Sequence, residues 1–190
     1  MKSVFFIKKE VVVVYVLMFC FSSFKITPPG KYKIGDTAQG GIVFWLDKTG
    51  DHGLVCTSFD MVNIKWYSGI YSNVETLKDT IGSGRINTTA IIQNQIMGNS
   101  TANYAAKLCD DLIVDVDGSK FDDWYLPSKY ELNLIYVNLK AAGLGNFGDG
   151  SYWTSCGVGN FYAWRQSFYE GEQTIAQKEY LYKVRAVRAF

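Results

Sequence analysis

The stretch that most constrains the fold is residues 122–132, which read DDWYLPSKYEL. Ser128 and Glu131 have the spacing of a capping box, in which the serine hydroxyl accepts a hydrogen bond from the third helical amide and the glutamate accepts one from the serine amide. Pro127 ends any preceding helix and favours an extended conformation at the residue before it. The stretch therefore predicts a short strand containing Trp124 that leads directly into a helix.

The spacing of apolar residues predicts three helices. One starts at Asn87 or Thr88, and a second starts near residue 101 with Cys109 on its buried side. The helix that follows the capping box runs to about residue 142, where a glycine ends it. The core-facing residues of this third helix recur at helical spacing and are Leu132, Ile135, Tyr136 and Leu139.

Short apolar runs bounded by glycine predict the strands. Residues 42–46 and 54–57 form a hairpin whose turn contains His52. Three further strands are expected near the C-terminus, at residues 152–155, 162–169 and 180–190. In the middle one of these, simple alternation divides the side chains between two faces. One face carries Trp164, Gln166 and Phe168, and the other carries Arg165, Ser167 and Tyr169.

Three segments between these elements are expected to be loops. Residues 59–74 show little periodicity and predict a long surface loop, whose Trp66 and Tyr67 are candidate ligand contacts. The glycines of residues 82–84 predict a flexible turn. Residues 115–118 predict an acidic turn and not a calcium loop, because the bidentate glutamate of a calcium loop is missing.

Residues 1–25 differ in composition from the rest of the chain. Lysines near the start precede an apolar run at 11–21, which is short for a membrane span and typical of a secretory signal peptide. A looser lipoprotein signal ends at Cys20, so lipid anchoring stays open as an alternative, as does an uncleaved anchor or a disordered leader. Residues 26–31 predict a linker, which leaves a single domain at 32–190. We therefore expect an exported protein, secreted or on a bacterial cell surface.

Charge and residue counts exclude several classes of function. Lysine and arginine total 19 against 18 acidic residues, so no positive field is expected to attract nucleic acid. His52, the one histidine, lies in a turn, so no Ser-His-Asp or Cys-His catalytic site can be assembled. The cysteines after the leader form no metal-binding cluster, and we expect no metal, no cofactor and no catalytic residue. Their pairing stays open among Cys56, Cys109 and Cys156, as does the oligomeric state.

Two arginines in the last predicted strand indicate internal ion pairs. Arg185 and Arg188 lie among apolar residues, where a guanidinium needs a carboxylate partner. The candidate partners are Asp123 and Glu131. We interpret the following residues as structural and not as ligand contacts: Trp124, Pro127, Ser128, Glu131, Arg185 and Arg188.

Several segments together resemble a known family. In chain order they are residues 40–45, 52–55, 87–88, 123–132, 152–155 and 184–190. The set is similar to the C-terminal domain family of the Legionella collagen-like adhesin and to the Fibrobacter major paralogous domain. Its most specific part is the Trp-x-Leu-Pro-Ser-x-x-Glu-Leu core, and the resemblance spans about residues 32–190.

The resemblance implies a fold and a ligand surface. The implied fold is α+β and C-type lectin-like, with two main helices packed on small antiparallel sheets. Some relatives resemble variable binding proteins whose C-terminal strands carry randomised aromatic and asparagine positions. In this chain the contacts so implied are Asn160, Phe161, Tyr162, Arg165, Ser167 and Tyr169.

The chain also departs from that family. The calcium and sugar motifs of true C-type lectins are absent, so calcium-dependent sugar binding is not implied. Many relatives carry a cysteine where this chain has Ala186, which puts the equivalent disulfide to Cys109 in doubt.

The function that we expect is an exported surface module that binds a glycan or a protein and is not an enzyme. Aromatic residues make up 16% of the chain, and surplus tyrosine and tryptophan often line recognition surfaces. A fold is compatible with many functions, and two alternatives stay open. One is an oxidase related to formylglycine-generating enzymes that uses Cys109 and Cys156, and the other is a structural component of a cell-surface assembly.

Overall fold

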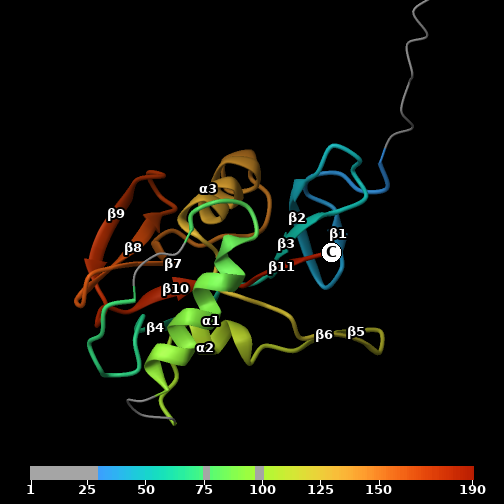
Figure 1. The fold of residues 1–190 in the computed structure, drawn as a ribbon. Helices are drawn as coiled ribbons and strands as arrows, with labels where there is room; N and C mark the ends of the chain where they lie inside the picture. Colours follow the sequence, from blue (N-terminus) through green and yellow to red (C-terminus); the bar gives the residue numbers. More distant parts are fainter. Residues whose placement is uncertain (1–29, 75–77, 97–100) are drawn as a thin grey trace, which may run out of the picture.

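The structure, a computed structural model, describes residues 30–74, 78–96 and 101–190. Within these residues, eleven strands form three sheets, with three α-helices beside them (Figure 1). The leader predicted at 1–25, including Cys20, and most of the predicted linker lie outside the described residues. None of the helices in the described part is both long and apolar enough to cross a membrane.

The first sheet is antiparallel and has the strand order β1-β2-β3-β11. The hairpin predicted from the two apolar runs is confirmed as β2 and β3, with a register shift between Val43 and Trp45. The final strand of the chain pairs with β3, so both ends of the described chain meet in this sheet. Its strands are β1 (Thr37–Ala38), β2 (Gly41–Leu46), β3 (Gly53–Cys56) and β11 (Val187–Ala189).

The second sheet has the strand order β4-β10-β7-β8-β9. Its neighbours are antiparallel except for β10 and β7, which are parallel. In β8, Arg165 pairs with Thr174 and Gln166 pairs with Gln173, so the predicted alternation of faces is present. The strands are β4 (Met61–Ile64), β7 (Ser151–Val158), β8 (Tyr162–Ser167), β9 (Gln173–Gln177) and β10 (Tyr182–Val184).

A separate two-stranded hairpin joins β5 (Val114–Val116) to β6 (Ser119–Phe121). Asp117 and Gly118 form its two-residue tip with φ of 52° and 82°, as a type I′ turn requires. The Asp115 carboxylate accepts a hydrogen bond from the Gly118 amide at 2.9 Å. The predicted acidic turn is therefore confirmed, as the tip of a hairpin.

The helix predicted from the capping box is confirmed as α3 (Lys129–Asn138). Both hydrogen bonds of the box are present, from the Glu131 amide to Ser128 Oγ and from the Ser128 amide to Glu131 Oε2. A 3₁₀ turn (Lys140–Ala142) follows, and Gly143 ends it with a φ of 72°, as expected for a helix C-terminus.

The predicted start of the first helix is wrong, because α1 (Ser83–Gln95) begins four residues before Asn87. Gly82 precedes it with a φ of 79°, and the residues 82–84 that we expected to be a flexible turn start the helix. Asn87 and Thr88 are buried inside the helix, where the Thr88 hydroxyl accepts a hydrogen bond from the Leu126 amide. The second helix, α2 (Ala105–Asp110), is shorter than expected, and Cys109 is buried as predicted.

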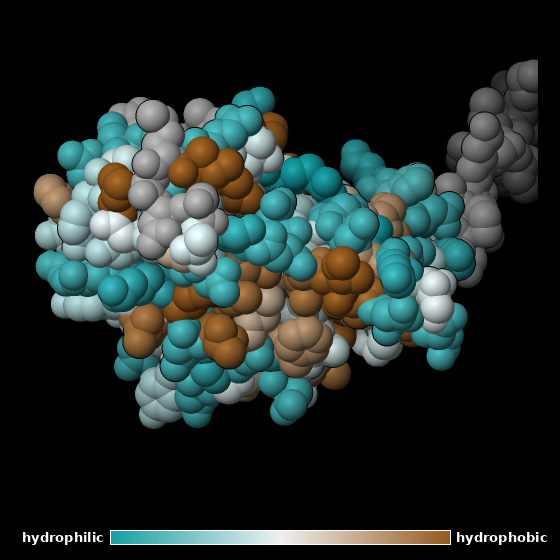
Figure 2. Space-filling view, turned by 90° about the horizontal axis from the view of Figure 1, so that it is seen from below, coloured by the Kyte–Doolittle hydropathy of each residue, from teal (hydrophilic) through white to brown (hydrophobic). Residues whose placement is uncertain are grey.

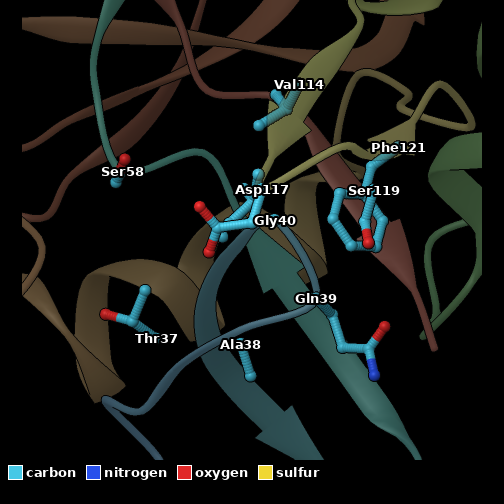
Figure 3. Close-up of a pocket in the computed structure, with 11 residues that line it drawn as sticks. Thr37, Ala38, Gln39, Gly40, Ser58, Val114, Asp117, Ser119 and Phe121 are labelled. Carbon is cyan, nitrogen blue, oxygen red and sulfur yellow. The ribbon is translucent and has the colours of Figure 1, made fainter.

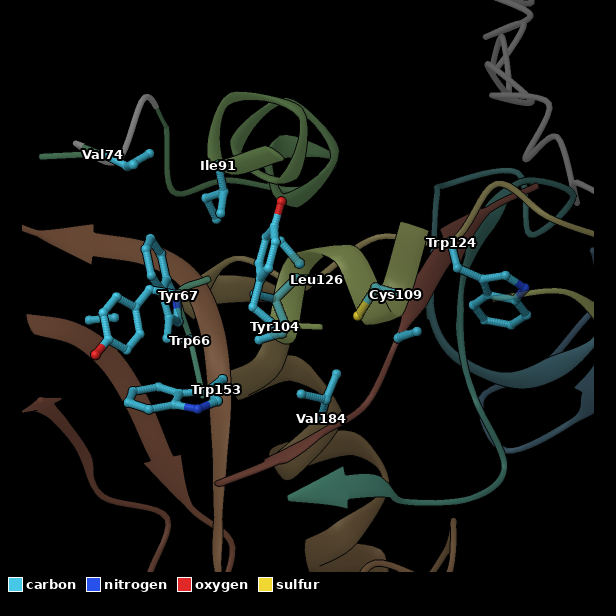
Figure 4. Close-up of a cluster of buried hydrophobic side chains, with 14 of the residues drawn as sticks. Trp66, Tyr67, Val74, Ile91, Tyr104, Cys109, Trp124, Leu126, Trp153 and Val184 are labelled. Carbon is cyan, nitrogen blue, oxygen red and sulfur yellow. The ribbon is translucent and has the colours of Figure 1, made fainter. Parts of the chain in front are cut away.

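The core consists of two clusters, one on each face of the second sheet. The first lies between that sheet and α1 and α2, and contains Trp66, Trp153, Ile91 and Tyr104 (Figure 4). The second lies against α3 and contains Phe44, Tyr152, Leu132 and Phe168. Burying a side chain of this size contributes about 2 to 3 kcal/mol, so the two clusters hold helices and sheets together.

The predicted fold class is wrong. The described residues form mostly sheet, and their three α-helices are short, with 13, 6 and 10 residues. This is not a C-type lectin-like α+β arrangement of two main helices on small antiparallel sheets. Several strands have only two to five residues, which is too short for a periodic pattern to reveal them, whereas the helix signals were long and clear.

Two segments were also misassigned. The single strand expected at residues 180–190 is divided into β10 and β11, which belong to different sheets. The surface loop expected at residues 59–74 contains β4 and the fully buried Trp66. Its many aromatic residues therefore belong in part to the core.

Candidate binding surface

The structure separates the residues that were expected to bind a ligand. Trp66 is fully buried and donates its indole hydrogen bond to the Thr154 carbonyl, and Tyr67 is buried beside it. We therefore correct their assignment, because a ligand cannot reach either ring. Tyr169 is 73% exposed but lies beyond the far end of β8 from Tyr162.

The other expected contacts remain at the surface. Asn160, Phe161 and Tyr162 are exposed at the start of β8. Arg165 and Ser167 are half-buried on the opposite face of β8 from Tyr162. Only part of the expected set therefore lies together.

Rings from three segments form a surface that we call the aromatic strip: the exposed Tyr71, Phe161 and Tyr180 and the half-buried Tyr182, with the guanidinium of Arg165. The Tyr71 and Phe161 ring centroids are 5.0 Å apart, and those of Tyr180 and Tyr182 are 6.3 Å apart. The Arg165 guanidinium carbon lies 5.7 Å from the Tyr182 centroid. Tyr71, Phe161 and Tyr180 are 40%, 53% and 48% exposed.

Glu179 connects the two halves of the strip. Its carboxylate accepts a hydrogen bond from the Tyr71 hydroxyl at 3.2 Å, and Tyr180 follows it in the chain. Glu179 and Tyr180 lie in the segment between β9 and β10. This segment crosses from the edge strand β9, past β8 and β7, to β10 on the far side of β7. Sequence reasoning missed Tyr71, Tyr180 and Tyr182 because their proximity depends on this crossing.

A buried lysine holds the strip in place. Lys178 is fully buried, and its ammonium donates hydrogen bonds of 2.9 Å to the carbonyls of Ser72 and Gly159. The same ammonium lies 4.6 Å from the centroid of the Trp66 ring system. Burial lowers the pKa of Lys178 to about 8. Lys178 thus joins the segment that carries Tyr71 to the turn that carries Phe161.

At its other end the strip borders a shallow hollow of about 330 Å³. Arg165 Nη1 donates a hydrogen bond of 2.8 Å to Ser151 Oγ, which is part of the hollow. Arg165 Nε is buried and has no hydrogen-bond partner among the described residues. The lining consists of Asn63, Asp149, Gly150, Ser151, Leu181, Tyr182 and Lys183.

A second hollow, of about 420 Å³, lies between the β1–β2 turn and the β5–β6 hairpin (Figure 3). Its lining includes Val114, Val116, Phe121 and the carboxylate of Asp117. Figure 2 shows the molecule from below, with separate apolar patches among hydrophilic residues, one of them in the region of this hairpin. Ile113, next to the hairpin, is strongly exposed. This hollow lies away from the aromatic strip and contains none of the expected contacts.

Among the residues interpreted as structural, Glu131 is the centre of a polar cluster. Glu131 accepts hydrogen bonds from the amides of Gly82, Gly84 and Ser128 and from the Tyr125 hydroxyl. Burial raises the pKa of Glu131 above its usual value, although these hydrogen bonds lower it. Two other residues of the 122–132 stretch are also held inside the protein. Trp124 is buried, and the Pro127 carbonyl accepts a hydrogen bond from the Ser155 amide.

The arginine partners were predicted in part. Arg188 pairs with Asp123, as expected. Arg185 is fully buried and pairs with Asp60, so the partners proposed for it are corrected. Burial raises the pKa of Asp60, but hydrogen bonds from Lys183, Tyr152 and Arg185 outweigh it and hold that pKa below its usual value.

The cysteines lie inside the protein. Cys56 and Cys109 are buried free thiols, and burial raises the pKa of Cys56 to about 12 and that of Cys109 well above its usual value. Cys156 is buried, and its sulfur accepts a hydrogen bond from the Lys129 amide. Within residues 30–74, 78–96 and 101–190, no group of three or more His, Cys, Asp or Glu side chains is placed to hold a metal ion.

Comparison with solved structures finds a likeness of fold. A fimbrial protein from Bacteroides ovatus has a similar structure, with a TM-score of 0.51 and 14% sequence identity over 79% of this chain. The chain spans 44% of that protein, less than half of its length. No family model and no curated protein matches the chain, so the resemblance to the adhesin C-terminal domain family stays a prediction.

Proposed function

We propose that this chain is a non-catalytic binding module of an exported or cell-surface protein, and that the aromatic strip binds a glycan or a protein. The observation that supports this best is that the buried Lys178 hydrogen-bonds to the two separate segments that carry the exposed rings of Tyr71 and Phe161, and so fixes them to each other. Tyrosine rings offer rigid, amphipathic contact area at low entropic cost. A braced surface loses little further entropy when a ligand binds.

The surface location has two independent supports. The N-terminal residues have the composition of a signal peptide or lipoprotein leader. The similar structure from Bacteroides ovatus is described as a fimbrial protein, a class that acts at the cell surface. The same likeness favours a second candidate function, a structural subunit of a surface assembly without a soluble ligand.

Ring removal tests the binding function. We expect Tyr71→Ala and Phe161→Ala each to weaken binding by about ten-fold or more, because hot-spot aromatic contacts contribute about 2 kcal/mol or more. Ligands are first sought on glycan arrays and on whole bacterial and host-cell surfaces, and affinities are then measured by calorimetry. Tyr169→Ala is the matched control, since Tyr169 is exposed outside the strip.

The outcomes separate the two candidates. Binding that is unchanged in both strip variants would refute the strip as the site. Absence of any ligand, together with co-purification of the chain in a stable envelope assembly, would favour the structural subunit. The oxidase alternative gains no support from Cys109, because burial raises the pKa of its thiol and a thiol with a raised pKa is a poor nucleophile.

A further inference from the structure

Arg165 differs from the other arginines of the chain. Arg85 and Arg188 pair with Asp123, and Arg185 pairs with Asp60. Among the described residues, no carboxylate lies within ion-pair distance of Arg165. Within the described part of the chain, its positive charge at the edge of the aromatic strip therefore has no counter-charge.

The guanidinium of Arg165 is nevertheless held in one orientation. Nη1 donates to Ser151 Oγ at 2.8 Å, and the Tyr182 ring lies against the guanidinium at 5.7 Å. Of the five N–H donors of a guanidinium, the bond to Ser151 uses one and the Nε donor is buried, which leaves the remaining Nη donors for a ligand. Polar groups left without a partner in a folded protein call for an explanation, and a ligand is one such explanation.

The other charged side chains around the hollow are engaged in ion pairs, whereas Arg165 is in none among the described residues. Lys183 is paired with Asp60, and Asp149 is paired with Lys140. Glu179 accepts the hydrogen bond of Tyr71 and so belongs to the other half of the strip. A ligand that covers the strip therefore meets a net positive end at Arg165.

We propose that the ligand is an acidic polysaccharide, whose sugar rings lie against the tyrosines and whose carboxylate binds Arg165. Guanidinium and carboxylate groups match in geometry, and hydrogen bonds between ions are about twice as strong as neutral ones. Tyrosine offers an apolar ring face together with a hydroxyl, which suits the C–H faces and hydroxyls of a sugar. This ligand class rests on the function proposed above.

The hollow favours a polysaccharide over an acidic protein. Protein interfaces are anchored by side chains that fill well-packed, fully desolvated pockets. The hollow beside the strip is open, and much of its lining is polar, with Asn63, Ser151 and Lys183. A surface of this kind suits a hydrated chain of sugars better than an apolar anchor.

The test compares matched charged and neutral sugars on the full chain. The probes are hexamers of galacturonate and of hyaluronan, each with its carboxyl methyl ester as the neutral form, and poly-glutamate as an acidic peptide. We expect the acids to bind about ten-fold or more tightly than their esters, as expected for one charge-assisted hydrogen-bonded pair. In Arg165→Met, acid and ester should bind equally, with the ester affinity unchanged.

The control variant is Lys48→Met, which removes one positive charge from an exposed loop of the first sheet and should leave the preference for acids intact. Thermal melting checks that Arg165→Met is folded.

Equal binding of acids and esters by the wild type, or no binding of either, would overturn the acidic ligand. If acids and esters bind equally and Tyr71→Ala abolishes that binding, the aromatic strip remains the proposed binding site, but its ligand need not be acidic. Equally tight binding of poly-glutamate would overturn the assignment to a polysaccharide.

Discussion

Lys178 brings a positive charge into the protein, where two carbonyl oxygens and an indole face surround it. Its pKa is about 8 in the folded protein and near 10.5 in an unfolded chain. Between these two pH values the unfolded state binds more protons than the folded state. The contribution of Lys178 to stability therefore rises as the pH rises from about 8 to 10.5.

The first prediction compares wild type with Lys178→Met in urea denaturation at several pH values from 7 to 10.5. The free energy of unfolding of the wild type should rise relative to that of the variant by about 1 to 2 kcal/mol across this range. A fall in the pKa of Lys178 from 10.5 to about 8 would by itself change the free energy of unfolding by more than this. We expect the smaller change because the two carbonyl oxygens favour the ammonium and offset part of the cost of burial. Lys65→Met, at an exposed position, is the control. Parallel curves for wild type and Lys178→Met would contradict the lowered pKa.

Single residues also show why the candidate site was predicted only in part. Phe161, Tyr162 and Arg165 lie in the C-terminal segment that the family resemblance implies as a binding surface, so they were selected from the sequence. Tyr71 joins Phe161 only because Lys178 fixes two distant segments to each other. No local pattern in the sequence reports a contact of that kind.

At the scale of elements, one carboxylate serves the N-termini of two helices. Glu131 completes the capping box of α3 and also accepts hydrogen bonds from the amides of Gly82 and Gly84 at the start of α1. Two helix N-termini, each with partial positive charge, thus share one negative side chain. Gly84 has to be glycine here, because a Cβ would lie 2.4 Å from Glu131 Oε2.

A second prediction follows for this shared cap. Glu131→Gln should lower the free energy of unfolding by about 2 to 3 kcal/mol, because an amide group places N–H donors against buried backbone amides. Ser128→Ala removes the cap of α3 alone and should cost about 1 kcal/mol. Hydrogen exchange at Gly84 should accelerate in Glu131→Gln and not in Ser128→Ala. Equal losses of stability, with no change at Gly84, would show that α1 does not depend on Glu131.

The elements that the sequence predicts correctly are those whose signals are local. The capping box, the β2–β3 hairpin and the glycine that ends the turn after α3 each depend on residues within a few positions of one another. The role of Glu131 in α1 spans 47 residues or more, and short strands such as β9 are stabilised by their neighbours and not by their own sequence. These features could not be read from the chain.

At the scale of the whole molecule, the last nine residues join the two large sheets. β10 lies in the second sheet and β11 in the first, and Arg185 lies between them. Its guanidinium donates to Asp60 and to the carbonyls of Thr57, Gly145 and Asn146. Asp60 also accepts hydrogen bonds from the Tyr152 hydroxyl and from Lys183. The 125 residues that separate Asp60 from Arg185 explain why sequence reasoning chose the wrong partner.

The third prediction tests whether this cluster makes the sheets unfold together. Asp60→Ala should lower the free energy of unfolding by about 3 to 5 kcal/mol, because it leaves the buried Arg185 without a counter-charge. Asp149→Ala removes an exposed partner of Lys140 and should cost at most about 1 kcal/mol.

Denaturation is followed by tryptophan fluorescence and by hydrogen exchange in β3 and β8, one strand from each large sheet. Because the Asp60 cluster connects β7 and β10 to the segment after β3, both strands should lose the same protection in Asp60→Ala. Loss confined to β8, with β3 unchanged, would show that the two sheets unfold independently. The C-terminal segment would then cross between the sheets without coupling them.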